Sequence, residues 1–456
     1  MPKNEPYRSI PKVDMVLKEP VLQELPYDMT IVKRFLREKL DHIRTAITKG
    51  ILTVSPDAST LAQEVADHAK SIMDSGLKEV INAAGVVVFT NLGRAPLARE
   101  AIDAVLDAAS TYTDLEYNLA EGKRGSRQDH IRPLTRACFG AEDALVVNNN
   151  AAAVMLVIAS LAKGCEVIIS RGELVEIGGS FRMPDVMAIS GAVMKEVGTT
   201  NKTKVTDYKN ALTDNTALIM KVHRSNFSIV GFTEEAGIDE LASLSRDFGK
   251  PLFVDMGSGV PFDLGPSGIP GEWTIPMCLQ QGADILCFSG DKVLGGPQAG
   301  IILGKADLIE TMARHPLHRA IRADKLTIAA LGATLRLLAQ GSIDRIPVLR
   351  MITEPVSDVK KRARRLLRLI KTNRSRIVST QAVIGGGSAP TKSFPSYGVF
   401  VQNPRAQQIL ARLRECSPAV LCRIEEESLI FDLKSVEQKE ISMLAHKINE
   451  VLSHEA

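Results

Sequence analysis

The sequence has little of what several specialised protein classes need. Its six cysteines include no pair at CxxC spacing, so neither a zinc site nor a disulfide framework is expected, and the thiols should be reduced. No apolar run approaches the roughly 18 residues of a membrane span, and the first residues lack a signal-peptide core. Internal repeats and low-complexity linkers are missing as well. A soluble, cytoplasmic protein without a metal site is the expectation that follows.

The sequence also has little excess of positive over negative charge. The formal net charge is only +3 over 456 residues, so the overall balance neither requires nor excludes a nucleic-acid partner. Hydrophobic residues make up 45% and charged residues 24%, which is typical of a globular chain with a large core. The length is sufficient for two or three domains.

Three regions differ in their sequence pattern. Residues 1–75 are expected to be helical, and the basic face of segment 31–47 is either a solvated surface or an RNA contact. Residues 76–340 alternate short apolar runs with amphipathic segments, which predicts a largely parallel sheet covered on both faces. Residues 341–456 include a strongly basic helix at 360–371 and predict a smaller α/β domain.

The large domain shows its expected elements clearly. Short apolar runs predict strands at 144–147, 167–170, 193–197, 218–222, 252–255, 285–289 and 300–303. Helical periodicity is found at 151–162, 238–248 and 326–338. Active sites of such sheets lie beyond the carboxyl ends of the strands, so the residues that follow each strand are the ones to examine.

The strand at 144–147 leads into three asparagines and then into a helix of small residues. The free N–H groups of a first helical turn favour a phosphate, which makes Asn149, Asn150 and Ala151 candidate phosphate contacts. Simple N-capping by asparagine explains the same residues. This motif alone does not decide between the two.

Asp255 ends the apolar strand at 252–255, ahead of a glycine-rich turn that contains Ser258. A carboxylate at the end of a buried strand is costly unless it meets a cation or several donors. A protonated pyridinium nitrogen is such a cation, and the alternative is a cap for the glycine turn. Ser258 is a further candidate cofactor contact.

Lys292 follows the strand at 285–289 in an apolar, glycine-rich segment. Desolvation lowers the pKa of a lysine and makes its amine a nucleophile towards aldehydes. Ser289, three residues earlier, is suited to bind a cofactor phosphate. A surface lysine is the alternative, but such residues usually have polar neighbours.

The order of phosphate turn, aspartate and Ser-x-x-Lys resembles that of the fold-type-I pyridoxal-phosphate (PLP) enzymes. Three longer runs are more specific: NNNAAAV at 148–154, SRGELVEIGG at 170–179 and FSGDKVLGGPQAGI at 288–301. With these runs, nearly the whole chain resembles the bacterial selenocysteine synthases, the L-seryl-tRNA(Sec) selenium transferases.

The resemblance implies a fold-type-I PLP-dependent transferase with a mostly parallel central sheet, a small C-terminal α/β domain and an N-terminal helical domain that binds tRNA. It implies conversion of seryl-tRNA(Sec) to selenocysteinyl-tRNA(Sec) with selenophosphate. The implied path runs through a PLP aldimine on Lys292 and an aminoacrylyl-tRNA, with Asp255 on the ring nitrogen and Lys292 as the base for the α-proton. A homodecamer is implied as well.

The selenium donor is an anion, so its site needs fixed positive charge. By similarity, Arg94, Arg127 and Arg319 are the candidate ligands, because arginine gives planar, bidentate contacts to oxyanions. Structural ion pairs are the alternative for each, and Arg124 or Arg322 could take their place. In a homodecamer, some of these arginines could act in a neighbour's site.

The sequence departs from the family pattern at positions beside these motifs, the first being Ala84, near which the family usually has threonine. Phe89 stands where the family usually has histidine, and Arg224 stands where a small threonine is common. These changes concern the substrate side of the site and leave the PLP residues intact.

Two rival functions remain to be compared. One is a PLP-dependent lyase that acts on a small phosphorylated amine or amino acid, for which the N-terminal domain would have no use. The other is a catalytically silent tRNA-binding scaffold, which the intact pair of Asp255 and Lys292 disfavours.

Overall fold

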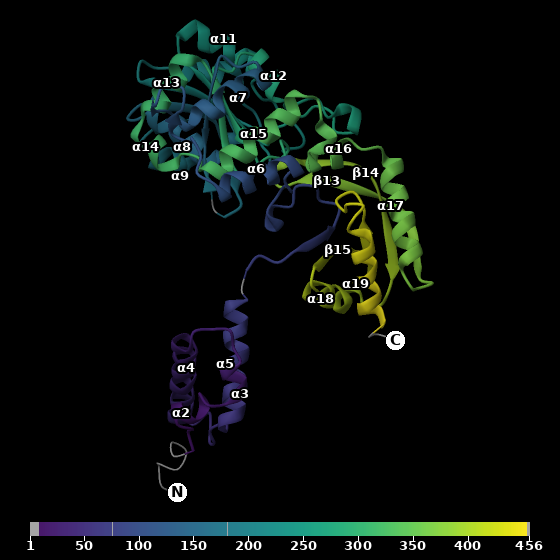
Figure 1. Ribbon diagram of the computed structural model, residues 1–456. Helices are drawn as coiled ribbons and strands as arrows, with labels where there is room; N and C mark the ends of the chain where they lie inside the picture. Colours follow the sequence, from purple (N-terminus) through teal and green to yellow (C-terminus); the bar gives the residue numbers. More distant parts are fainter. Residues whose placement is uncertain (1–8, 75, 180, 454–456) are drawn as a thin grey trace. The chain divides into compact units, whose positions relative to one another are not determined.

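The computed structural model describes residues 9–74, 76–179 and 181–453, and the chain forms two compact units, 1–79 and 80–456. Among the described residues, the second unit contains two large sheets, two short two-stranded ribbons and helices, and the first contains helices and no strand (Figure 1). None of the helices in the described ranges is long and apolar enough to cross a membrane.

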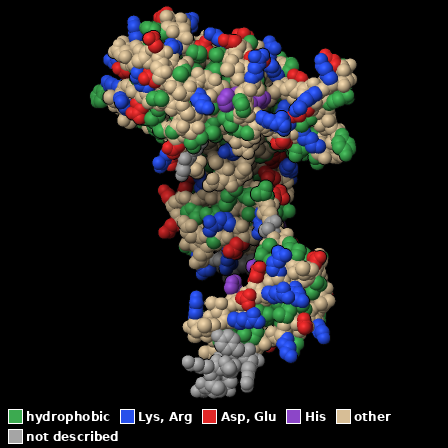
Figure 2. All heavy atoms as spheres, turned by 90° about the vertical axis from the view of Figure 1, so that its left-hand side faces the viewer, with side chains coloured by type: hydrophobic (Ala, Val, Ile, Leu, Met, Phe, Trp, Pro, Cys, Tyr) green, Lys and Arg blue, Asp and Glu red, His purple; other side chains and the backbone are tan. Residues whose placement is uncertain are grey.

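The first unit has an apolar core of its own. Its helices are α2 (Val13–Val16), α3 (Pro20–Gln23), α4 (Met29–Thr48) and α5 (Ala58–Met73). Asp28 and Asp57 cap the two long helices, because their carboxylates accept hydrogen bonds from the backbone N–H groups of Thr30 and Thr60. Lys and Arg side chains are prominent on the face of this unit at the bottom of Figure 2. The expected helix at 31–47 is confirmed.

The large sheet of the second unit has seven strands, and every expected strand is confirmed to within two residues. In spatial order they are β4 (Asp143–Val147), β12 (Gly300–Gly304), β11 (Ile285–Ser289), β10 (Leu252–Gly257), β9 (Thr216–Val222), β5 (Glu166–Ser170) and β8 (Val193–Val197). Among these seven strands, β12 alone runs in the direction opposite to the other six. The prediction of a mostly parallel sheet is therefore confirmed.

Helices cover both faces of this sheet, because successive side chains of each strand point to opposite faces. Val146 packs into one apolar core with helices such as α7 (Arg132–Phe139), α11 (Ile238–Phe248) and α15 (Lys325–Ala339). Its neighbour Val147 packs into the other, with α8 (Asn150–Leu161), α9 (Met183–Ile189) and α13 (Ala306–Arg314). Nearly continuous apolar strands are the sequence consequence of burial on two sides.

The second sheet has five strands. In spatial order they are β1 (Val80–Ala83), β15 (Ala419–Glu425), β16 (Ser428–Asp432), β14 (Ser388–Gln402) and β13 (Ser375–Gly385). Helices α17 (Val356–Leu369), α18 (Ala406–Glu415) and α19 (Ile441–Ser453) share its core. Strand β1 lies within the range 76–340 but pairs with β15, parallel to it. The basic helix expected at 360–371 corresponds to α17, which buries only its apolar side.

Other elements connect these layers. The further helices are α6 (Arg99–Ser110), α10 (Val205–Ala211), α12 (Ile275–Gln280), α14 (Pro316–Ile321) and α16 (Pro347–Thr353). Two short ribbons pair β2 (Tyr117–Asn118) with β3 (Lys123–Arg124) and β6 (Glu176–Ile177) with β7 (Phe181–Arg182).

Candidate active site

A cavity of about 940 Å³ opens at the carboxyl ends of the central strands of the large sheet. Loops and helix N-termini converge at this edge in open α/β sheets, so ligands usually bind there. The loops after β4, β9, β10 and β11 all contribute to the cavity, and the turn between β13 and β14 reaches it from the second sheet. The predicted site residues that line it are Arg94, Asn149, Asn150, Ala151, Asp255, Ser289 and Lys292.

Lys292 lies just beyond β11 and is buried, with 7% of its surface exposed. Burial lowers the pKa of its amine, while the carboxylates of Asp255 and Asp291 oppose that shift. Gly387, in the turn between β13 and β14, has a φ of 75°, and a Cβ there would lie 3.4 Å from Nζ of Lys292. Glycine therefore allows this turn to come close to the amine.

Asp255 lies in β10 beside β11, with its carboxylate buried and held by neutral donors. The side-chain amide of Asn150 donates to Oδ1 at 2.9 Å, the N–H of Gly257 donates at 3.2 Å and the thiol of Cys287 at 3.5 Å. Burial raises the pKa of Asp255, whereas the hydrogen bond from Asn150 and the charge of Lys292 lower it. A cation facing this carboxylate would compensate its desolvation.

Several buried polar atoms at the cavity have no hydrogen-bond partner among the described residues. They include Oδ1 of Asn150, Nε of Arg94, Nδ1 of His223 and, beside the cavity, Oγ of Ser258. Buried polar atoms are nearly always paired in proteins, so unpaired ones around one cavity indicate a ligand. The N-terminus of α8 adds free N–H groups, since Asn149 caps only one of them by accepting from Ala152.

These residues fit PLP. A buried amine can hold the aldehyde, a buried carboxylate on the adjacent strand can meet the ring nitrogen, and a helix N-terminus with Ser289 beside it can bind the phosphate. Ser258 is buried but does not line the cavity among the described residues, so its predicted cofactor contact stays a prediction.

Arg94 is the one arginine of the predicted anion set that lines the cavity. It has a φ of 66°, and its guanidinium contacts the carboxylate of Asp291 at 2.5 Å. The neighbouring Asp291 is mostly buried, so this ion pair holds the arginine beside Lys292. Phe89, one of the departures from the family pattern, also lines the cavity.

The other predicted arginines lie elsewhere in the chain. Arg127 contacts Glu116 at 2.5 Å, and Arg322 and Arg124 contact the same carboxylate at 2.9 and 3.3 Å. Arg319 is exposed on α14. The structure therefore does not bring Arg127 and Arg319 together with Arg94 in the cavity of one chain.

Residues that the sequence did not single out also shape the cavity. His223 follows β9 and lines it, with Nε2 at 3.8 Å from Glu272 and the ring packed against Trp273. Burial lowers the pKa of His223, and the charge of Glu272 opposes this. Lys392 of β14 contacts Glu272 at 2.7 Å, so the second sheet is tied to this wall. The sequence signal that could have identified His223 is its position as a polar residue directly after an apolar strand.

The buried ion pair of Glu173 and Lys221 is a further feature that the sequence pattern did not indicate. Nζ of Lys221 contacts Glu173 at 2.7 Å, and the N–H of Val222 donates to the same carboxylate. Burial raises the pKa of Glu173, and the lysine lowers it. The pair fixes the loop after β5 against the end of β9. Two glycines that line the cavity, Gly178 and Gly179, follow Glu173 in the chain.

The fold and the site together define a fold-type-I PLP-dependent enzyme. The solved structure of a D-glucosaminate-6-phosphate ammonia-lyase is similar to this chain with a TM-score of 0.61 at 20% identity, over 85% of this chain and 98% of that one. Similarity at this level supports the fold alone, and it agrees with the architecture described above.

Sequence comparison identifies the family within that class. The family model of the L-seryl-tRNA selenium transferases matches residues 80–437. The L-seryl-tRNA(Sec) selenium transferase of Carboxydothermus hydrogenoformans is 47% identical, covering 95% of each chain. That of Aquifex aeolicus is 44% identical over 98% of this chain and 99% of the relative. The chain belongs to the L-seryl-tRNA selenium transferase family, so the predicted enzyme class and the PLP cofactor are confirmed.

Proposed function

We propose that this chain converts seryl-tRNA(Sec) to selenocysteinyl-tRNA(Sec), the reaction for which its relatives are named, with selenophosphate as the selenium donor. The observation that carries this proposal is the meeting of Lys292 and Asp255 in one large cavity, on a chain that matches those relatives over nearly its full length.

PLP, when bound, supplies an electron sink for negative charge at the α-carbon of the seryl group. Lys292, Asp255, Ser289 and the N-terminus of α8 would hold it. Lys292 then acts as a base: because burial lowers its pKa, its amine is available to take the proton from the α-carbon. Because Asp255 and Lys292 line the same cavity, the base and the carboxylate that holds the cofactor act in one site.

Asp255 positions the ring nitrogen in this proposal. Its carboxylate already accepts three hydrogen bonds, and the amide of Asn150 fixes its orientation. Burial raises the pKa of Asp255, so the carboxylate gains most from a cation placed beside it. A protonated ring nitrogen meets that need.

Arg94 is the proposed ligand of the selenophosphate anion within its own chain. Its unpaired Nε and its place in the cavity support this role. Arg127 and Arg319 are proposed to act in the cavity of a second copy, which goes together with a homo-oligomer, a decamer by resemblance to the family. A cytoplasmic location is proposed on the same basis.

The first unit is proposed to bind the tRNA. On α4, Lys33, Arg34 and Arg37 have no carboxylate partner among the described residues, whereas Lys39 pairs with Glu64 at 3.0 Å. Unpaired cations on a helix surface are available for phosphates, and their contacts weaken as salt rises. Loss of tRNA affinity, with PLP retained, is the expected effect of deleting residues 1–70.

A single reaction tests the proposal. The PLP-loaded protein is given seryl-tRNA(Sec) with and without selenophosphate, and the amino acid released from the tRNA is identified. Selenocysteine that forms only with selenophosphate, and not in Lys292→Ala, is the expected result. Unchanged serine from a PLP-loaded protein would contradict the proposal and favour a lyase that acts on small phosphorylated amines.

A further inference from the structure

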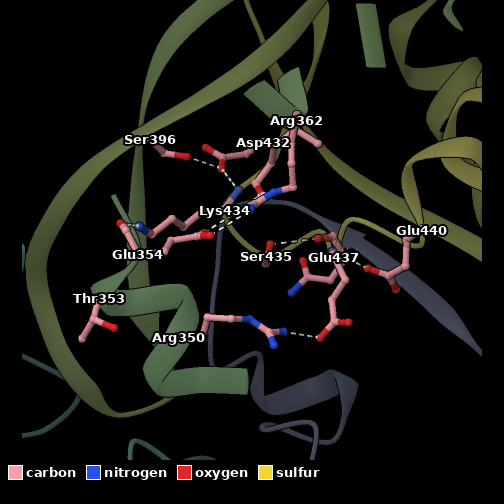
Figure 3. A network of polar contacts seen from close by, with 12 residues as sticks. Arg350, Thr353, Glu354, Arg362, Ser396, Asp432, Lys434, Ser435, Glu437 and Glu440 are labelled. Atoms are coloured by element: carbon pink, nitrogen blue, oxygen red, sulfur yellow. Dashed lines mark hydrogen bonds and ion pairs between the residues drawn. The ribbon is translucent and has the colours of Figure 1, made fainter. Parts of the chain in front are cut away.

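A second cavity, of about 370 Å³, lies between α16, α17 and the segment that connects β16 to α19. Figure 3 shows the polar network around it, with the ion pair of Arg362 and Glu354 on one side and that of Arg350 and Glu437 on the other. None of its lining residues belongs to the cavity around Lys292.

Positive charge exceeds negative charge in this second cavity. Arg362 contacts both carboxylate oxygens of Glu354, at 2.5 and 2.7 Å, and also donates to the carbonyl of Leu433. Glu437 contacts Arg350 at 2.6 Å and Lys439 at 3.5 Å. Both carboxylates that line the cavity are thus paired already, and N–H groups of Arg350 and Lys439 remain available.

Lys434 adds a buried cation to the lining. It is 1% exposed, and its ammonium donates to the carbonyl of Glu354 at 3.3 Å and lies 5.2 Å from the ring centroid of Phe394. Among the described residues, no carboxylate lies within 4.0 Å of this ammonium, which is the distance limit for an ion pair. An ammonium has three N–H donors, and burial with so few partners is costly. Burial accordingly lowers the pKa of Lys434, while Glu354 opposes the shift.

We propose that this cavity binds the phosphate group of a small molecule, with Lys434, Arg350 and Lys439 as its cationic ligands. An anion there would supply the partner that the buried ammonium lacks. Met351 and Val436 give the cavity an apolar wall, and its volume falls within the range of small-ligand sites. The burial of Lys434 favours a free phosphorylated molecule over an RNA backbone, which carries the same chemical group.

The test is a calorimetric titration of the PLP-loaded full chain with inorganic phosphate and with pyrophosphate. Four proteins are compared: the parent, Lys434→Met, Arg350→Met and a control, Arg364→Met. Arg364 is an exposed cation of α17 outside the cavity, so its loss changes the net charge equally. Any phosphate bound near Arg94 is common to all four and cancels in the comparison.

The proposal expects Lys434→Met and Arg350→Met to weaken one phosphate site by roughly tenfold or more, while Arg364→Met leaves it unchanged. Arg350 is 39% exposed, and without it Glu437 still has Lys439 as an ion-pair partner. Arg350→Met should therefore fold, and it carries the test if Lys434→Met does not fold. Equal phosphate binding in all four proteins would overturn the proposal.

A second arm identifies the source of the phosphate. If the phosphate belongs to a free molecule, the affinity for tRNA is the same in the parent and in both cavity variants. If it belongs to the tRNA backbone, both variants lose tRNA affinity and tRNA displaces inorganic phosphate from the site. Either result keeps the phosphate site and fixes what fills it.

Discussion

The cavity around Lys292 and the cluster around Glu116 both contain arginines that the sequence predicts as anion ligands, yet their polar groups are arranged differently. In the cavity, Nε of Arg94 and Oδ1 of Asn150 are buried without partners. Around Glu116, three arginines share one carboxylate, and their charges and hydrogen bonds lower its pKa, with Arg127 contributing most.

The difference shows how a ligand site is distinguished from a structural ion pair. Groups that stabilise the fold satisfy one another, whereas groups that await a ligand stay buried and incompletely bonded. Residue type alone does not separate the two, since arginine occurs in both. The comparison therefore predicts large effects of substitution in the cavity and a small effect of substituting Glu116.

The largest effect is expected for Lys292→Ala. Removing the amine removes both the attachment point of the cofactor and the base, so activity should fall by roughly 10⁴-fold or more. Selenium transfer and the absorption of bound PLP are the measurements, with Lys209→Ala on the exposed side of α10 as a matched control. A variant that keeps full activity would show that another lysine carries the cofactor.

Asp255→Asn should be the next most damaging change. The amide keeps the shape of the carboxylate but removes the charge that faces the ring nitrogen, so kcat should fall by roughly 10²-fold. The same protein should still fold, because the neutral side chain is less costly to bury. Steady-state kinetics at saturating PLP measure the effect, and an unchanged kcat would exclude Asp255 as the partner of the ring.

Arg94→Gln and Glu116→Gln compare the two regions directly. Loss of a charge-assisted hydrogen bond at Arg94 should raise the KM for selenophosphate by roughly tenfold to a hundredfold. Glu116→Gln disturbs a partly exposed cluster and should change that KM less than about fivefold. Arg127→Gln should also raise the KM, because Arg127 is proposed to reach the donor from a second copy, and an unchanged KM would contradict that role.

The smallest effect concerns the pH dependence of stability after PLP is removed. Burial lowers the pKa of Lys292 below its ordinary value of 10.5. Between the lowered value and 10.5 the unfolded chain binds more protons than the folded one, so the free energy of unfolding rises with pH in that window. Each pKa unit contributes about 1.4 kcal/mol.

Urea unfolding of the parent and of Lys292→Met across this pH window measures the difference. The parent should gain stability relative to the variant as pH rises, because the substitution removes the titrating amine. Parallel pH profiles would mean that the Lys292 amine is solvated in the folded state.

The sequence predicts the parts of this fold that are encoded locally. Apolar runs reveal the strands of the large sheet because those strands are buried on both faces, and Asp255 and Lys292 stand out as polar residues at strand ends. Pairing of β1 with β15 joins residues more than 300 positions apart, and nothing in either strand specifies the other. The antiparallel direction of β12 is equally invisible in its residues.

The candidate site follows the same division. Lys292, Asp255 and Asn150 are recognisable by type and position, and the structure brings them into one cavity. The approach of Gly387 to Lys292 depends on how the second sheet packs, so no local pattern announces it. Likewise, the contact between Arg127 and Glu116 depends on the tertiary structure and could not be predicted from the local sequence.

Chemical trapping of the cofactor tests the central claim most directly. The PLP-loaded protein is reduced with borohydride, digested, and the peptide that carries the pyridoxyl group is identified by mass spectrometry. The expected result is a single modified residue, Lys292, in the peptide that follows β11. Modification of a different lysine, or of none, would contradict the site proposed for this enzyme.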